Sequence, residues 1–160
     1  MSTVKVGFIG CGGIAQDHAS ALATLPEAEM VAFCDVDLAR AAAFRDQYAR
    51  GEAQVFDDYR DLYRQAKLDV VYICVPPFAH GDIEFACCDL GLPMLIEKPV
   101  AIDMEMAKPI LAAIQKADVA TVVAYKYRWD DHVIKAKEML ADKKIGLVFG
   151  NFWGGTPGAP

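Results

Sequence analysis

The chain has 160 residues, of which 54% are hydrophobic and 24% charged, and its formal net charge is -6 at pH 7. This length suffices for one ordinary domain with a core, and the composition is typical of a globular protein rather than a disordered one. The acidic balance argues against a nucleic-acid partner, which requires a basic surface. No apolar run reaches the roughly 18 residues of a membrane span and no signal peptide is visible, so we expect a cytoplasmic protein without a membrane partner.

The cysteines give no sign of cross-linking or metal binding. They are odd in number and form no C-x-x-C pair, so the sequence predicts neither a disulfide framework nor a zinc site. Most of them stand in or beside apolar runs, where a free cysteine behaves as a small hydrophobic residue. The five are Cys11, Cys34, Cys74, Cys87 and Cys88.

Short apolar runs alternate with segments of helical periodicity along the chain. The predicted strands are residues 4–10, 30–34, 54–56, 70–75, 94–96 and 121–124. The predicted helices are residues 14–25, 38–48, 58–65 and 79–90, and a fifth that opens near Asp103, in which Pro109 predicts a kink or a late start. Strands that alternate with helices in this rhythm predict βαβ units in a doubly wound parallel sheet, the Rossmann fold.

The segment GFIGCGGIA joins the first predicted strand to the first predicted helix. Read as G-x-G-x-x-A, it allows a tight turn at Gly10, close approach of a pyrophosphate at Gly12, and close packing of helix on strand at Ala15. The helix then opens at Ile14, directly after Gly13, and its unpaired N–H groups and positive dipole end suit phosphates. Glycines also serve plain strand-to-helix turns, so the motif needs its context.

Asp35 supplies that context, because it closes the second predicted strand 20 residues beyond Ala15. A carboxylate there can accept both ribose hydroxyls of adenosine and would repel a 2′-phosphate. The sequence therefore predicts a dinucleotide site rather than a structural turn. NAD is preferred and NADP stays possible, since Arg40 stands nearby.

Val75, Pro76 and Pro77 end the fourth predicted strand in a rigid apolar lip, because proline donates no N–H and holds the chain extended. Such a lip suits the nicotinamide ribose, and an ordinary strand stop is the alternative. His80 is expected in the first turn of the next helix, where a lone histidine is more often a capping or packing residue than a catalyst. The other two histidines are predicted to be structural or surface residues, His18 and His132.

The tripeptide Glu97-Lys98-Pro99 ends the fifth predicted strand, on the edge where open α/β sheets bind ligands. Pro99 favours an extended Lys98 and removes one backbone donor, so the lysine has a fixed direction. A lysine beside an oxidised nicotinamide could handle a proton or orient a hydroxyl during hydride transfer. Glu97 could pair with Lys98 or cap its neighbours, and a solvent-exposed strand exit is the alternative for the whole motif.

These stretches, together with YRDL and YKYRW, resemble the amino-terminal part of the glucose-fructose oxidoreductase / inositol dehydrogenase family (Gfo/Idh/MocA). The resemblance implies NAD(P)-dependent oxidation or reduction of a sugar, polyol or similar small molecule. It implies that Lys98 lies between nicotinamide and substrate and that Arg128 lies near the substrate pocket. The cofactor contacts that we expect are Gly10, Gly12, Gly13, Ile14, Asp35, Val75, Pro76, Pro77, His80, Glu97 and Lys98.

Members of that family continue into a second α/β domain, whose D-x-x-x-H segment carries the usual acid/base histidine. No such segment occurs in these 160 residues. We therefore expect an NAD(P)-binding domain over residues 1–124, followed over residues 125–160 by a connecting helix and the first strand, IGLVFGNFWGG, of a truncated second domain. The resemblance also implies a homo-oligomer for the full-length protein, and a chain that is inactive alone.

Two other classes of function remain open. A non-catalytic dinucleotide-binding module, which senses redox state or regulates a partner, fits the absence of the acid/base histidine. A methyltransferase also uses a glycine turn and an acid after the second strand, but the proline lip and Glu97-Lys98-Pro99 have no role in that chemistry.

Overall fold

The computed structural model describes residues 3–151 of the chain, which divides into two compact units, Met1–Tyr125 and Lys126–Pro160. The first unit contains one six-stranded sheet in the order β3-β2-β1-β4-β5-β6, with every neighbouring pair parallel. The strands are β1 (Val4–Ile9), β2 (Ala28–Cys34), β3 (Gln54–Phe56), β4 (Val70–Ile73), β5 (Met94–Ile96) and β6 (Thr121–Val123). The doubly wound parallel sheet expected from the sequence is confirmed.

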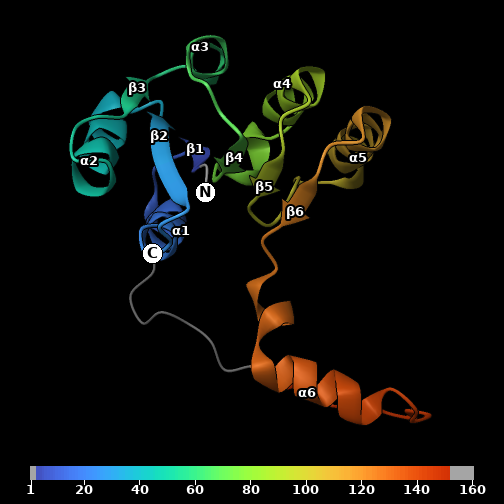
Figure 1. Cartoon of the computed structure of the whole chain (residues 1–160). Coiled ribbons are helices and arrows are strands. Elements are labelled where there is room, and N and C mark those ends of the chain that lie inside the picture. The colour runs from blue at the N-terminus through green and yellow to red at the C-terminus, as the bar shows by residue number, and fades with distance from the viewer. Residues whose placement is uncertain (1–2, 152–160) are drawn as a thin grey trace. The chain divides into compact units, whose positions relative to one another are not determined.

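Helices cover the sheet on both faces (Figure 1). On one face α1 (Gly13–Leu22) and α2 (Leu38–Tyr48) pack over a core that includes Phe8 and Phe33. On the other face α3 (Tyr59–Gln65), α4 (Asp82–Leu90) and α5 (Met104–Ala117) pack over a core that includes Ile9 and Ile73. Neighbouring residues of one strand, Phe8 and Ile9, thus enter different cores, which explains why the strands read as continuous apolar runs. Burying each such side chain contributes about 1.5–3 kcal/mol.

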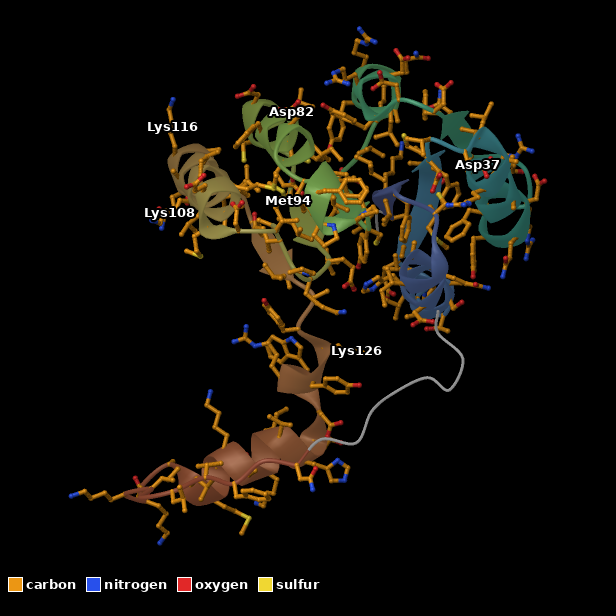
Figure 2. All side chains as sticks on the ribbon, turned by 180° about the vertical axis from the view of Figure 1, so that it is seen from behind. Asp37, Asp82, Met94, Lys108, Lys116 and Lys126 are labelled. Carbon is orange, nitrogen blue, oxygen red and sulfur yellow. The ribbon has the colours of Figure 1, made fainter. Side chains whose placement is uncertain are left out.

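Aspartates cap the starts of three helices in the first unit. The side chains of Asp37, Asp58 and Asp103 accept hydrogen bonds from backbone N–H groups in the first turns of α2, α3 and α5. Figure 2 labels Asp37 at the start of α2. Asp103 caps α5 and Pro109 lies inside that helix, so the helix does not start late, and a kink at Pro109 stays a prediction. Each cap contributes about 1 kcal/mol.

The segment after β4 differs from the predicted continuous helix over residues 79–90. A 3-10 turn, η1 (Pro77–Ala79), is followed by α4, which begins only at Asp82. His80 between them is extended, and Gly81 has φ +111°, which lies outside the helical region. His80 therefore does not lie in the first turn of a helix, because Gly81 provides a conformation that breaks the helical run.

Other predicted segments end early or do not form in the described part of the chain. Helix α1 ends at Leu22 rather than at residue 25, where the Thr24 hydroxyl and N–H both donate to the Ala21 carbonyl and close the last turn. Of the predicted final strand, residues 145–151 have no strand structure. Its remaining residues lie outside the described part of the chain.

The second unit contains a 3-10 turn, η2 (Lys126–Trp129), and one helix, α6 (Asp131–Leu140), whose start is capped by Asp130. Leu147 and Phe149 beyond the helix are exposed. Over residues 3–151, no helix has the length and apolar character needed to cross a bilayer. Within the same range no cluster of His, Cys, Asp or Glu could hold a metal ion.

All five cysteines are free and buried, as small hydrophobic residues should be. Burial raises the pKa of Cys34, Cys74 and Cys87 from an ordinary value of 9.0 to about 12. The folded chain therefore retains thiol protons at a pH where the unfolded chain releases them.

The free energy of unfolding is accordingly expected to fall as the pH rises from about 9 toward 12, because the native state then binds more protons than the unfolded state. Each raised thiol steepens the fall by about 1.4 kcal/mol per pH unit. Urea denaturation at several pH values measures the slope. Cys87→Ala should lower the free energy of unfolding at neutral pH. It should also make the fall with pH less steep by about 1.4 kcal/mol per pH unit, the contribution of one thiol. An unchanged slope would contradict this explanation.

Candidate functional site

A cleft of about 850 Å³ opens at the carboxyl ends of β1, β2 and β4. Strand β1 lies between β2 and β4, so the chain order reverses direction here, and open α/β sheets bind ligands at such a switch point. Val75 lines the cleft together with six other residues predicted for the site: Gly10, Gly12, Ile14, Asp35, Pro76 and His80. Gly13, Pro77, Glu97 and Lys98 do not line it.

The glycine turn forms part of the lining of the cleft, and its two key glycines serve different purposes. Gly10 has φ +89°, and a Cβ there would lie 2.4 Å from the Cys74 carbonyl oxygen, so the fold itself requires glycine. A Cβ at Gly12 would meet nothing within 4 Å. The fold leaves space at Gly12, which is what the close approach of a phosphate requires.

Helix α1 begins directly after Gly12, and no side chain caps its first N–H groups. These groups and the helix dipole remain available to an anion. Ala15 is fully buried and lets α1 pack closely on the sheet, as the motif predicts. The residues present therefore fit a pyrophosphate.

Asp35 is almost completely buried and holds two loops together. Its Oδ2 accepts a hydrogen bond from the Cys11 N–H at 2.8 Å, and its Oδ1 accepts one from the Asp37 N–H at 2.9 Å. Each carboxylate oxygen retains another lone pair, so the group can still accept hydroxyl protons. The sequence predicted the ribose role but not this structural role at the turn.

Arg40, which kept NADP possible, lies beside an acid. Its Nε is 3.4 Å from Asp37 Oδ2, and both side chains are exposed, so the ion pair is weak. Arg40 lines the same cleft as Asp35.

His80 and Glu84 form a buried pair, with side chains that are 1% and 0% exposed. His80 Nδ1 lies 2.6 Å from Glu84 Oε1, and the Gly81 N–H donates to Glu84 Oε2 at 2.6 Å. Glu84 was missed by the sequence analysis, although its four-residue spacing from His80 is a usable signal. Within residues 3–151, His80 Nε2 is the one buried side-chain nitrogen or oxygen without a partner. A buried nitrogen without a partner, in a residue that lines the cleft, calls for an explanation such as a water or a ligand atom.

Glu97 is 5% exposed, and both of its carboxylate oxygens are engaged. Oε1 lies 2.8 Å from His18 Nε2, and Oε2 accepts the Lys98 backbone N–H at 3.0 Å. The prediction that Glu97 caps its neighbour thus agrees with the geometry, whereas a side-chain pair with Lys98 does not occur. The prediction that His18 is merely structural or on the surface missed its contact with the Glu97-Lys98-Pro99 motif.

Lys98 is exposed at the end of β5 and makes no ion pair within residues 3–151, and its peptide bond to Pro99 is cis. Arg128 belongs to the second unit, where its guanidinium carbon lies 5.5 Å from the centroid of the Trp129 ring. The nearness of Arg128 to a substrate pocket stays a prediction.

Comparison with known proteins decides the family. Residues 4–125 match the Gfo/Idh/MocA model, described as an oxidoreductase family with an NAD-binding Rossmann fold. The chain belongs to this family. The family assignment made from the sequence motifs is confirmed.

Two curated relatives and one solved structure illustrate the similarity. The chain is 33% identical over 146 residues to the inositol 2-dehydrogenase of Salmonella typhimurium, covering 90% of this chain and 43% of that protein. It is 28% identical over 149 residues to the D-glucoside 3-dehydrogenase of Escherichia coli, covering 92% and 42%. The scyllo-inositol dehydrogenase of Lactobacillus casei, solved with NAD(H) and scyllo-inositol, has a TM-score of 0.82 at 26% identity, covering 91% and 43%. The chain thus spans less than half the length of these relatives.

The two glycines should separate binding from folding. Gly12→Ala is expected to leave the melting temperature nearly unchanged and to weaken NADH binding about tenfold or more, because its methyl group enters the space for the phosphates. Gly10→Ala should destabilise the fold by about 1–3 kcal/mol or more, through backbone strain and the clash with Cys74. Calorimetric titration and thermal melts measure the two effects.

Gly51→Ala is the matched control, because Gly51 also has a positive φ of +84° but a Cβ there would meet nothing within 4 Å. It should lower stability mildly and leave NADH affinity intact. Equal NADH affinity in Gly12→Ala and the unmodified chain would contradict the assignment of Gly12.

Proposed function

We propose that this chain is the cofactor-binding part of an NAD-dependent dehydrogenase that transfers hydride between nicotinamide and a sugar or polyol. The observation that carries the proposal is the open space at Gly12, beside an uncapped helix start and the fixed carboxylate of Asp35. The inositol and glucoside dehydrogenases among the relatives support the substrate class. We further propose a cytoplasmic protein that forms a homo-oligomer at its native length.

The first half of the sheet would hold the adenosine diphosphate part of NAD. The free N–H groups after Gly12 bind the pyrophosphate, and the remaining lone pairs of Asp35 accept the adenosine ribose hydroxyls. A 2′-phosphate would meet the buried Asp35 carboxylate, which favours NAD. Arg40 lines the same cleft, and its weak pair with the exposed Asp37 leaves it available to a 2′-phosphate, so NADP stays the alternative.

His80 would bind the second ribose or the nicotinamide side. The Glu84 carboxylate favours the proton on Nδ1, which leaves the lone pair of the orphan Nε2 as an acceptor for a hydroxyl. Val75 and Pro76 provide the rigid apolar lip beside it. Because Glu84 is bonded through both oxygens, the imidazole is held in one orientation.

Lys98 would act at the substrate. NAD, when bound, supplies the hydride acceptor and NADH the hydride donor. The exposed lysine at the end of β5 orients the reacting hydroxyl or carbonyl oxygen and holds or moves its proton. Arg128 is proposed as a further contact to the substrate, on the strength of the family motif alone.

Calorimetric titration with NADH and NADPH in parallel tests the cofactor assignment. We expect saturable NADH binding and at least about tenfold weaker NADPH binding, because of the Asp35 carboxylate. Tighter binding of NADPH would contradict the role of Asp35. If neither NADH nor NADPH binds, the proposed function is contradicted.

Replacement of Lys98 tests the catalytic assignment in the protein at its native length, with myo-inositol, scyllo-inositol and D-glucosides as substrates. Lys98→Met should lower kcat about 100-fold or more while NADH affinity changes little, because a proton-handling group typically contributes 10²–10⁴-fold. Lys116→Met is the matched control, since Lys116 is an exposed lysine of α5 (Figure 2). Full turnover by Lys98→Met would refute the role of Lys98, and NADH binding without turnover of any substrate would favour a non-catalytic module.

A further inference from the structure

We propose that His18 and Glu97 are positioning residues, which hold the strand end that carries Lys98 in register with the helix that opens at the glycine turn. The inference rests on the proposed dinucleotide binding and adds to it the residues that align the two halves of the site. Neither residue lines the cleft, so the pair acts through the elements that it joins.

The pair links two elements that are distant in sequence. His18 lies in α1 and Glu97 directly follows β5, 79 residues further along the chain, yet Nε2 and Oε1 are 2.8 Å apart. The His18 ring also contacts Tyr72 of β4 edge-on, with ring centroids 5.5 Å apart. The imidazole therefore reaches from α1 across β4 to the end of β5.

Glu97 connects the His18 contact to the backbone of Lys98. Its own N–H donates to the Ile73 carbonyl at 2.9 Å, which fixes its backbone to the end of β4. Its second carboxylate oxygen accepts the Lys98 N–H, so the same side chain that meets α1 also fixes the backbone of the lysine. A buried carboxylate oxygen without a partner is costly, so the loss of His18 would leave Oε1 unpaired and force the Glu97 side chain to move.

The arrangement matters because a dinucleotide crosses the sheet at the switch point. The pyrophosphate belongs to the start of α1 and the adenosine to the β1–β2 side, whereas nicotinamide belongs to the β4–β6 side, where Lys98 lies. A ligand that spans both halves depends on their alignment. A ligand confined to the adenosine diphosphate half does not.

Titration of the 160-residue chain with NADH and with ADP separates positioning from general stability. His18→Phe keeps an aromatic ring against Tyr72 but removes the nitrogen that meets Glu97. It should weaken NADH binding about tenfold, the value of a hydrogen bond to a charged group, and change ADP binding less than about twofold. His18→Gln keeps an N–H group within reach of Glu97 and should restore most of the NADH affinity.

His132→Phe is the matched control, because the His132 side chain is 96% exposed and lies in the second unit. It should change neither affinity. If His18→Phe fails to fold, Glu97→Gln takes its place, since it keeps the acceptor for Lys98 but weakens the contact with His18, and it should lower NADH affinity alone.

Equal loss of NADH and ADP affinity, or no loss of either, would overturn the inference while leaving the proposed function intact. Failure of His18→Gln to restore NADH affinity would also overturn it. An unmodified chain that binds neither ligand would instead overturn the proposed function, and this inference with it.

Discussion

The tight turn at Gly10 is the constraint on which the rest of the site depends. The chain leaves β1 at this point against the backbone of Cys74, which leaves no room for a side chain. The Gly10 N–H donates to the Cys34 carbonyl at 2.8 Å, and the next N–H, of Cys11, donates to Asp35. The ends of β1, β2 and β4 are thereby tied together, and the same turn places Gly12 and the start of α1 at the cleft.

The acidic side chains near this turn are buried and accept hydrogen bonds from neighbouring residues. Asp35 accepts two backbone N–H groups, and Glu84 and Glu97 each use both carboxylate oxygens. Carboxylates that accept a hydrogen bond at each oxygen hold their neighbours in fixed directions, which is what a site for an extended ligand needs. Glu84 contacts His80 and Glu97 contacts the backbone of Lys98, so these two acids hold residues that are themselves proposed to meet the ligand.

The sequence was sufficient for the features that depend on local chemistry. Apolar runs and the glycine spacing predicted the sheet, its helices and the tight turn at Gly10. It was insufficient where distant residues meet, since no local pattern reveals that His18 contacts Glu97. The break at Gly81 was missed because glycine also occurs within helices, and only its positive φ shows that the helix starts later. The strand predicted from residue 145 onward has no neighbouring strand to pair with among the described residues. Because a lone strand is not stable, residues 145–151 do not form one.

The most direct test of the central claim is a map of backbone amide NMR shifts on addition of NADH. The account predicts that the largest shifts fall on the turn from Gly10 to Ile14, on Asp35 and on the Val75–His80 segment. Residues at the opposite edge of the sheet, such as Val4 and Ala120, should be unaffected. Shifts confined to that opposite edge, or none at saturating NADH, would contradict the claim that this cleft binds the dinucleotide.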